Sequence, residues 1–169
     1  MSATRYRTGF TLTELVTVVV LLGIVSIFAA SRFFSRSDFD ERGFFELSMQ
    51  ATRYAQQVAM ASGCDVRVQF TGSGYSLHKW INGGSCAADS GGAGLTLLQR
   101  PGGGDFSDTA PDGVSVASAT WYFDSIGRPR VASGGGFGNL IASAASVTVG
   151  GRTLTVEPET GFVRCTAGC

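Results

Sequence analysis

Charged side chains are scarce in this chain, and neither sign is in excess. Only 15% of the 169 residues are charged, and 13 basic residues balance 13 acidic ones. Proteins that bind nucleic acid carry a basic excess or a basic cluster, and the composition offers no such indication. Glycine is instead abundant, with 24 residues. That content favours a turn-rich β domain over a helical bundle.

Residues and motifs that carry catalysis are also few. His78 is the single histidine, and no Ser lies in a G-x-S-x-G elbow. No C-x-x-C is present, which argues against zinc. Asp105, Asp108 and Asp112 could in principle collect Ca²⁺, but their spacing does not fit an EF-hand, so a solvated acidic loop is expected. We therefore predict a protein that is not an enzyme and holds no metal or cofactor; the alternative from a different class is a membrane-anchored periplasmic hydrolase.

The four cysteines come late, at Cys64, Cys86, Cys165 and Cys169. An even count behind an apolar segment suggests disulfides formed in an oxidising compartment. Three connectivities are open. Pairing Cys64 with Cys86 and Cys165 with Cys169 is favoured, because each pair then closes a local loop. Free buried thiols are the alternative if the domain faces the cytoplasm.

Residues 10–30 form an apolar run in which Glu14 is the one charged residue. As a helix this run would be about 30 Å long, the thickness of a bilayer's hydrocarbon core. Arg5 and Arg7 precede it and should stay cytoplasmic. We therefore expect contact with membrane lipid and a single-pass protein of the inner (cytoplasmic) membrane, with the N-terminus in the cytoplasm and the C-terminal domain in the periplasm.

The heptapeptide Gly9-Phe-Thr-Leu-Thr-Glu-Leu15, with a short basic leader before it and an apolar run after it, resembles the processing signal of type IV prepilins and type II secretion pseudopilins. The resemblance implies cleavage between Gly9 and Phe10 by a prepilin peptidase, N-methylation of Phe10, and assembly into a helical filament. Glu14 would neutralise the N-terminal ammonium of a neighbouring subunit. A plain single-pass anchor with a chance glutamate is the alternative.

The partners implied are other pilins or pseudopilins, the prepilin peptidase and methyltransferase, and the inner-membrane assembly platform. The assembled filament would be periplasmic or extracellular.

Residues 31–62 are predicted to continue the helix. Asp38 and Glu41 have the spacing of a capping box, where the helix can restart, and Gly63 is its expected stop. Apolar residues recur every three or four positions along one predicted stripe: Phe44, Leu47, Ala51, Tyr54, Val58 and Ala61. Beyond Gly63 the period changes to two, which predicts strands at 65–70, 75–81, 95–99, 114–116, 120–123, 128–131, 146–149, 152–156 and 160–164.

Three later stretches are similar to the GspH/FimT pseudopilin family: residues 51–68, 121–128 and 156–164. The sequence of the N-terminal half also resembles that of minor pilins of mannose-sensitive haemagglutinin pili. The fold class expected is α+β, with a long N-terminal α-helix, its first half transmembrane, packed on an antiparallel β-sheet or sandwich. The expected organisation is a leader at 1–9, a transmembrane and filament-core helix at 10–30, its amphipathic continuation at 31–62 and a periplasmic β domain at 63–169.

The function expected is that of a minor pilin or pseudopilin, a structural subunit that joins or initiates a type IV pilus or a type II secretion pseudopilus. Some relatives of the FimT branch serve DNA uptake through C-terminal arginines, so a DNA-binding minor pilin is an alternative. Its candidate contacts are Arg128, Arg130, Arg152 and Arg164. Four arginines would bind phosphates weakly and in a salt-sensitive way, and solvated turn arginines are favoured.

Overall fold

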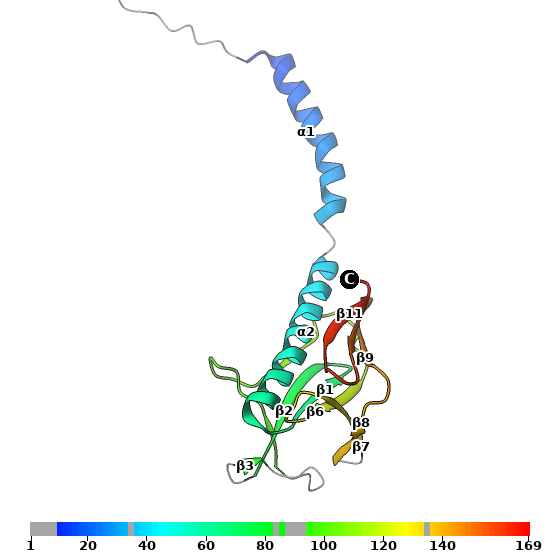
Figure 1. Ribbon diagram of the computed structural model, residues 1–169. Helices are drawn as coiled ribbons and strands as arrows, with labels where there is room; N and C mark the ends of the chain where they lie inside the picture. The colour runs from blue at the N-terminus through cyan, green and yellow to red at the C-terminus, as the bar shows by residue number, and fades with distance from the viewer. Residues whose placement is uncertain (1–9, 34–35, 83–84, 87–93, 134–135) are drawn as a thin grey trace, which may run out of the picture. The chain divides into compact units, whose positions relative to one another are not determined.

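A computed structural model describes residues 10–33, 36–82, 85–86, 94–133 and 136–169 of the protein. The chain divides into two compact units, Met1–Arg36 and Ser37–Cys169. The first unit contains helix α1 (Leu12–Phe33), and α2 (Arg36–Ser62) belongs almost wholly to the second, with the described strands (Figure 1). Leader residues 1–9 lie outside the described residues.

The predicted fold class is wrong in its helical part. In place of one long N-terminal helix, the chain forms two separate helices, α1 and α2, which fall almost entirely in different compact units. The second helix begins at Arg36, two residues before the predicted capping-box residue Asp38. The pattern of apolar residues therefore predicted that both segments are helical, but it did not predict where the first helix ends and the second begins.

The predicted single-pass location in the inner membrane is also wrong. Among the described residues, no helix combines the length and the apolar character that crossing a bilayer requires.

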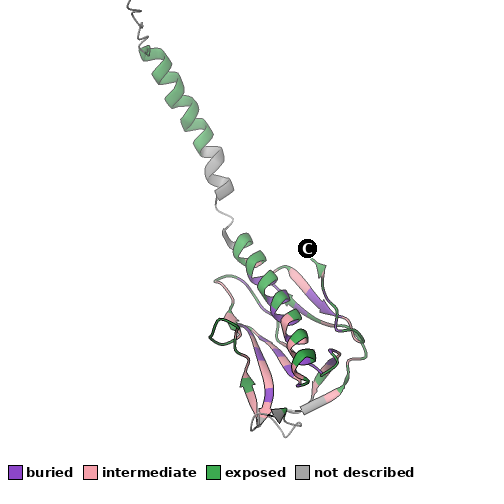
Figure 2. Cartoon of the chain, turned by 60° about the vertical axis from the view of Figure 1, so that its left-hand side comes forward, coloured by how far each residue is buried: buried purple, intermediate pink, exposed green. Residues whose placement is uncertain are grey.

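Helix α2 packs one face on the sheet domain, and burial alternates along it (Figure 2). The predicted stripe is correct in part, because Phe44 and Ala51 are buried and Tyr54 and Val58 pack against the core. Leu47 of the stripe is 48% exposed, however, while Phe45 outside it is 1% exposed. Two polar residues share this face because each hydroxyl donates to the carbonyl four residues earlier: Ser48 to Phe44 at 2.8 Å and Thr52 to Ser48 at 2.9 Å. Ala55 and Ala59, both 0% exposed, let the helix lie close to the sheet.

Every strand pair in the described residues is antiparallel. The larger sheet has the order β3-β2-β1-β6-β7-β8, with β4 and β5 also pairing with β2. Its strands are β1 (Val66–Thr71), β2 (Gly74–Asn82), β3 (Ser85–Cys86), β4 (Leu95–Leu97), β5 (Ser107–Thr109), β6 (Ala119–Phe123), β7 (Pro129–Ser133) and β8 (Gly136–Leu140). The smaller sheet has the order β11-β10-β9, from β9 (Ala145–Val149), β10 (Arg152–Val156) and β11 (Val163–Ala167).

The core lies between α2 and the two sheets. It joins Phe44, Phe45 and Met49 of the helix to alternate residues of β1, β6 and β10. In Figure 1, α2 runs beside β1, β2 and β6, and the chain ends near β11. Because successive strand residues point to opposite faces, one face of the large sheet meets α2 and the other is turned away from it.

The hairpins β1–β2 and β9–β10 confirm the period-two predictions at 65–81 and 146–156. The prediction of a strand at 114–116 is wrong, because Val116 makes only an isolated bridge to Val149. Strands β5 and β8 form at 107–109 and 136–140, where no strand was predicted.

Candidate functional site

Helix α1 begins with a cap that involves Glu14. The Glu14 backbone N–H donates to the Thr11 hydroxyl at 3.3 Å, and the Thr17 hydroxyl donates to the Glu14 carbonyl at 2.9 Å. Thr11 and Glu14 thus have the T-x-x-E spacing of a capping box, and the carboxylate sits in the first turn, where the helix dipole favours negative charge. Glu14 therefore has a local structural role at the start of α1, and its assembly role stays a prediction.

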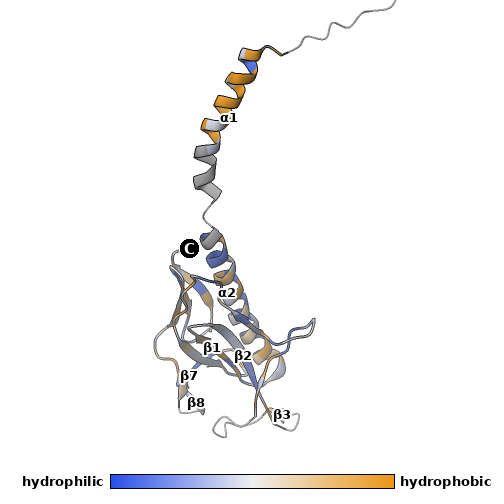
Figure 3. Cartoon of the chain, turned by 180° about the vertical axis from the view of Figure 1, so that it is seen from behind, coloured by the Kyte–Doolittle hydropathy of each residue, from blue (hydrophilic) through white to orange (hydrophobic). Residues whose placement is uncertain are grey.

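The described part of α1 is apolar on all sides and exposed on all sides. Each residue from Phe10 to Ser26 is exposed, and Leu12 and Val25 remain 80% and 61% accessible. Figure 3 shows hydrophobic colouring over most of this stretch. Burying one such side chain stabilises by about 1.5–3 kcal/mol, so the helix has a strong tendency to be covered. Gly9, the residue before the predicted cut, lies outside the described residues.

Both favoured disulfides are present, which confirms the predicted pairing. Cys64–Cys86 joins the end of α2 to β3, with a sequence separation of 22, and Cys165–Cys169 closes a C-terminal loop with a separation of 4. The first bond restrains the edge of the large sheet and the second restrains the end of β11.

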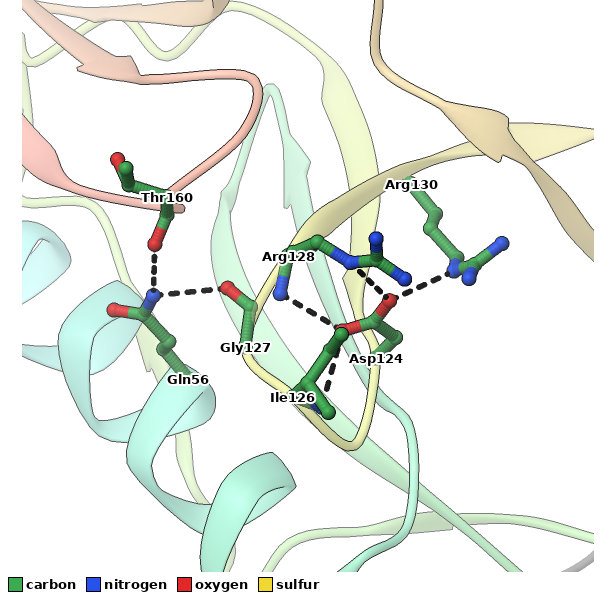
Figure 4. Close-up of polar contacts among 7 residues, drawn as sticks. All are labelled: Gln56, Asp124, Ile126, Gly127, Arg128, Arg130 and Thr160. Atoms are coloured by element: carbon green, nitrogen blue, oxygen red, sulfur yellow. Dashed lines mark hydrogen bonds and ion pairs between the residues drawn. The ribbon is translucent and has the colours of Figure 1, made fainter.

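Arg128 and Arg130 converge on Asp124 in the β6–β7 turn (Figure 4). The Nε atoms of the two arginines lie 3.2 and 3.1 Å from Oδ2 of Asp124. The other carboxylate oxygen accepts the backbone N–H groups of Ile126 at 3.1 Å and Arg128 at 2.8 Å. Both candidate DNA contacts in this turn are therefore paired with an internal carboxylate that is only 5% exposed.

The electrostatics of this turn follow from burial and from those hydrogen bonds. Burial alone would raise the pKa of Asp124, but the backbone N–H groups of Arg128 and Ile126 and the side chain of Arg130 lower it below its usual range. The pKa of Asp65 is raised, first by burial and then by the Asp124 carboxylate. The turn therefore holds one firmly ionised carboxylate under two guanidinium groups.

The other two candidate DNA contacts are paired as well. Arg152 Nε lies 3.5 Å from Glu41 Oε1 of α2, and its guanidinium also donates to the Gly168 carbonyl. Arg164 lies 2.7 Å from Glu157. Each of the four arginines thus has a carboxylate partner within the chain, which reduces the positive potential that a phosphate would meet.

Gln56 of α2 joins two turns of the sheet domain (Figure 4). Its side-chain N–H₂ donates to the carbonyls of Gly127 at 2.9 Å and Thr160 at 2.8 Å. The turns lie in contact at Gly161, where φ is +67° and an added Cβ would lie 2.3 Å from the Gly127 carbonyl oxygen. Only glycine fits this position without displacing α2 or the neighbouring turn.

The acidic loop shows no calcium-like arrangement. Asp105 accepts a hydrogen bond from Gln99 at 2.6 Å, and Asp108 forms an ion pair with Arg100 at 2.8 Å. Across the part of the chain that the structure describes, no group of three or more His, Cys, Asp or Glu residues could hold a metal ion.

A cavity of about 450 Å³ opens beside α2, between the helix and the segment that carries β5. Tyr54 stacks on Phe106 with ring centroids 4.8 Å apart, and the Arg100 guanidinium lies 5.2 Å from the Phe106 ring. The Tyr75 hydroxyl donates to Asp108 at 3.0 Å. Burial, and then the Asp108 carboxylate, raise the pKa of Tyr75 above its usual range. This cavity was not predicted, because the polar sequence of 101–113 gives no sign that Phe106 folds back onto α2.

The chain matches no protein-family model, no curated protein and no solved structure. A functional assignment therefore depends on the chain's own residues and geometry.

His78 lies on β2 and is partly buried. Burial, and then the nearby Arg67, lower its pKa to about 4, so the imidazole is neutral at neutral pH. Arg67 is its register partner on β1. Sequence reasoning missed this pair, because alternation places a residue on a face but does not reveal which residue lies opposite it on the next strand.

Proposed function

We propose that the protein is a structural subunit, a minor pilin or pseudopilin, that joins or initiates a helical filament of the type IV pilus or type II secretion kind. One observation carries the proposal: the described side chains of α1, from Leu12 to Ser26, are mostly apolar and exposed on every side, and Glu14 in the first turn is the one charged residue among them. The motif from Gly9 to Leu15 that resembles a prepilin processing signal supports it.

The geometry of α1 favours several neighbours over one. A helix that is apolar all round is normally buried, and a single partner helix covers only one of its sides. Helices from several subunits packed in a bundle cover all sides, as in the core of a helical filament. Glu14 would need a cationic partner in such a core, and the N-terminal ammonium of a neighbouring subunit supplies one.

The sheet domain and the disulfides support the same proposal in a different way. Most large apolar residues of the domain are packed within it, so α1 is the part of the chain that most needs partners. The two disulfides favour folding in an oxidising compartment. The DNA-binding alternative has less support, because its four candidate arginines each pair with a carboxylate.

The test is assembly in the host cell, measured as incorporation into filaments that are sheared off or pelleted. Glu14→Gln removes the charge but retains a residue that suits the capping box, whereas Glu14→Ala removes both. We expect both variants to be incorporated at least roughly tenfold less than the wild-type protein, because an unpaired ammonium is left in an apolar core. Glu46→Gln, at an exposed position of α2, is the matched control.

Mass spectrometry of the mature protein gives an independent readout. A chain that begins at methylated Phe10 supports the proposal, and one that retains Met1 contradicts it. Normal incorporation of Glu14→Gln would contradict the role of the charge.

A further inference from the structure

A row of side chains crosses the face of the large sheet turned away from α2. Val66 and Val68 of β1 lie in the core, so Arg67 between them points to the opposite face. Arg67 is the register partner of His78 on β2 and of Tyr122 on β6, and Tyr122 is the partner of Arg130 on β7. Three basic residues and one tyrosine thus lie side by side across four strands.

The two arginines of this row differ in their partners. Arg130 forms an ion pair with Asp124 at 3.1 Å. Within the described ranges, Arg67 takes part in no ion pair, and its Nε is buried without a hydrogen-bond partner. A guanidinium with a desolvated N–H and no acceptor is unfavourable, and proteins normally supply a carboxylate or another acceptor.

Like Arg67, His78 has a buried nitrogen, Nδ1, without a hydrogen-bond partner among the described residues. The residues opposite it are Arg67 on β1 and Leu97 on β4. Beyond Arg67 lie Tyr122 and Arg130, and the carboxylates of Asp65 and Asp124 interact with Arg130.

We propose that Arg67 and His78 together bind an oxyanion, either a carboxylate or a phosphate-type group. The planar guanidinium offers several N–H donors that match two oxygens of such a group. The anion would supply the acceptor that Arg67 Nε lacks, and the protonated imidazole would donate to a second oxygen.

Binding is expected to be linked to proton uptake. The pKa of His78, about 4 in the free protein, is low because of burial and the positive charge of Arg67. A bound anion offsets that charge and stabilises the imidazolium, so the pKa of His78 rises and a proton is taken from solvent. By the same linkage, the anion binds more tightly as the pH falls from neutral toward 4.

The presence of a single histidine makes the test direct. Full-length protein without a histidine tag, kept in solution with a non-ionic detergent, gives one set of imidazole NMR signals. The pKa of His78 is measured in chloride, then with sulfate or formate added at constant ionic strength. Sulfate stays ionised throughout the titration, and formate is mostly ionised in its upper part, where the raised midpoint is measured. We expect a saturable rise of roughly one unit or more, which means about tenfold tighter binding to the protonated form.

Two variants give the matched comparison. In Arg67→Gln the response to the anions should disappear. In Lys79→Gln, which removes a neighbouring cation of β2 opposite Val66 on the core side of β1, it should persist. A response to sulfate alone identifies a phosphate-type group, and a response to formate identifies a carboxylate. An unchanged His78 pKa in the wild-type protein, or an equal response in Arg67→Gln, would overturn the proposal. These readouts need only the sheet domain's own residues, so they do not depend on filament assembly.

Discussion

The two helices of this chain differ in how far their apolar side chains are buried. Helix α2 turns one face to the sheet domain, where Phe45 is 1% exposed and Ala55 is 0% exposed. Helix α1 has no such face, and Leu22 in its middle is 60% exposed. Both helices are regular, so the difference lies in their surroundings: α2 packs within its own unit, and the described side chains of α1 are exposed.

The polar residues of the two helices repeat this difference. In α2, Ser48 and Thr52 are buried with their hydroxyls bonded to the helix itself, and Gln56 bonds to two turns of the domain. In α1, Glu14 is exposed and no ion pair in the described ranges includes it. Helix α2 is therefore an integrated part of its domain, whereas Glu14 of α1 has no ion-pair partner within the described ranges.

The largest expected effect tests whether α2 is a true core element. Phe45→Ala should lower the free energy of unfolding by about 3–5 kcal/mol, because it removes a buried aromatic ring and leaves a cavity. Phe39→Ala changes the same residue type on the same helix, but at a position that is 77% exposed. Its effect should stay within about 0.5 kcal/mol in urea denaturation. Equal losses would mean that α2 is not docked as described.

The contact between the domain's turns and α2 predicts the next effect. Gly161→Ala would place a Cβ 2.3 Å from the Gly127 carbonyl oxygen and 2.5 Å from Gln56 Nε2. Gly63 has nearly the same φ, +66°, with open space around it. We expect Gly63→Ala to lose about 1–2 kcal/mol from the left-handed conformation alone. Gly161→Ala should lower the free energy of unfolding by about 1–3 kcal/mol more, because of overpacking. Thermal or urea unfolding measures both variants.

A smaller effect tests the polar attachment of α2. Gln56→Ala leaves the carbonyls of Gly127 and Thr160 without their donor and should lower stability by about 1–2 kcal/mol. Gln57→Ala, one residue along and exposed, should change the free energy of unfolding by less than about 0.5 kcal/mol. Indistinguishable urea midpoints for the two variants would contradict the role assigned to Gln56.

The smallest effect on folding is expected in α1. Leu22→Ala should change the unfolding of Ser37–Cys169 by less than about 0.5 kcal/mol, since the side chain is exposed and alanine is a good helix former. The same change should reduce filament incorporation, because an apolar contact between subunits is lost. A variant that destabilised the domain as strongly as Phe45→Ala would show that α1 belongs to the same core.

Local patterns in the sequence predicted the parts of this fold that local physics decides. The turns at Gly72–Gly74 and Gly150–Gly151 join adjacent strands of alternating sequence, and both hairpins form. The disulfides followed from short loop closure. The buried face of α2 was predicted only in part: Phe44 and Ala51 are buried as predicted, but Ser48 and Thr52, which look exposed by polarity, are buried too because they bond their own helix. Whether a polar residue is buried depends on a backbone contact that periodicity does not register.

Long-range pairing is what the sequence could not reveal. Strand β5 exists because Ser107 meets Ser76 of β2, thirty-odd residues earlier, and its three residues carry no apolar alternation of their own. The Arg67–His78 pair likewise depends on the register of β1 against β2. The boundary between α1 and α2 near Arg36 was not predicted either, because no glycine or proline lies there to indicate a break in the helix.

The two disulfides have a consequence for the order of events as the chain matures. Cys165 and Cys169 are 4 residues apart, so they can meet in an unfolded chain, whereas Cys64 and Cys86 are 22 apart and are brought together across the β1–β2 hairpin and β3. Alignment of β1, β2 and β3 holds the distant pair together, so we expect its oxidation to be favoured once these strands have formed. Counting free thiols over time during oxidative refolding would therefore show when the second disulfide closes and fixes the edge of the sheet.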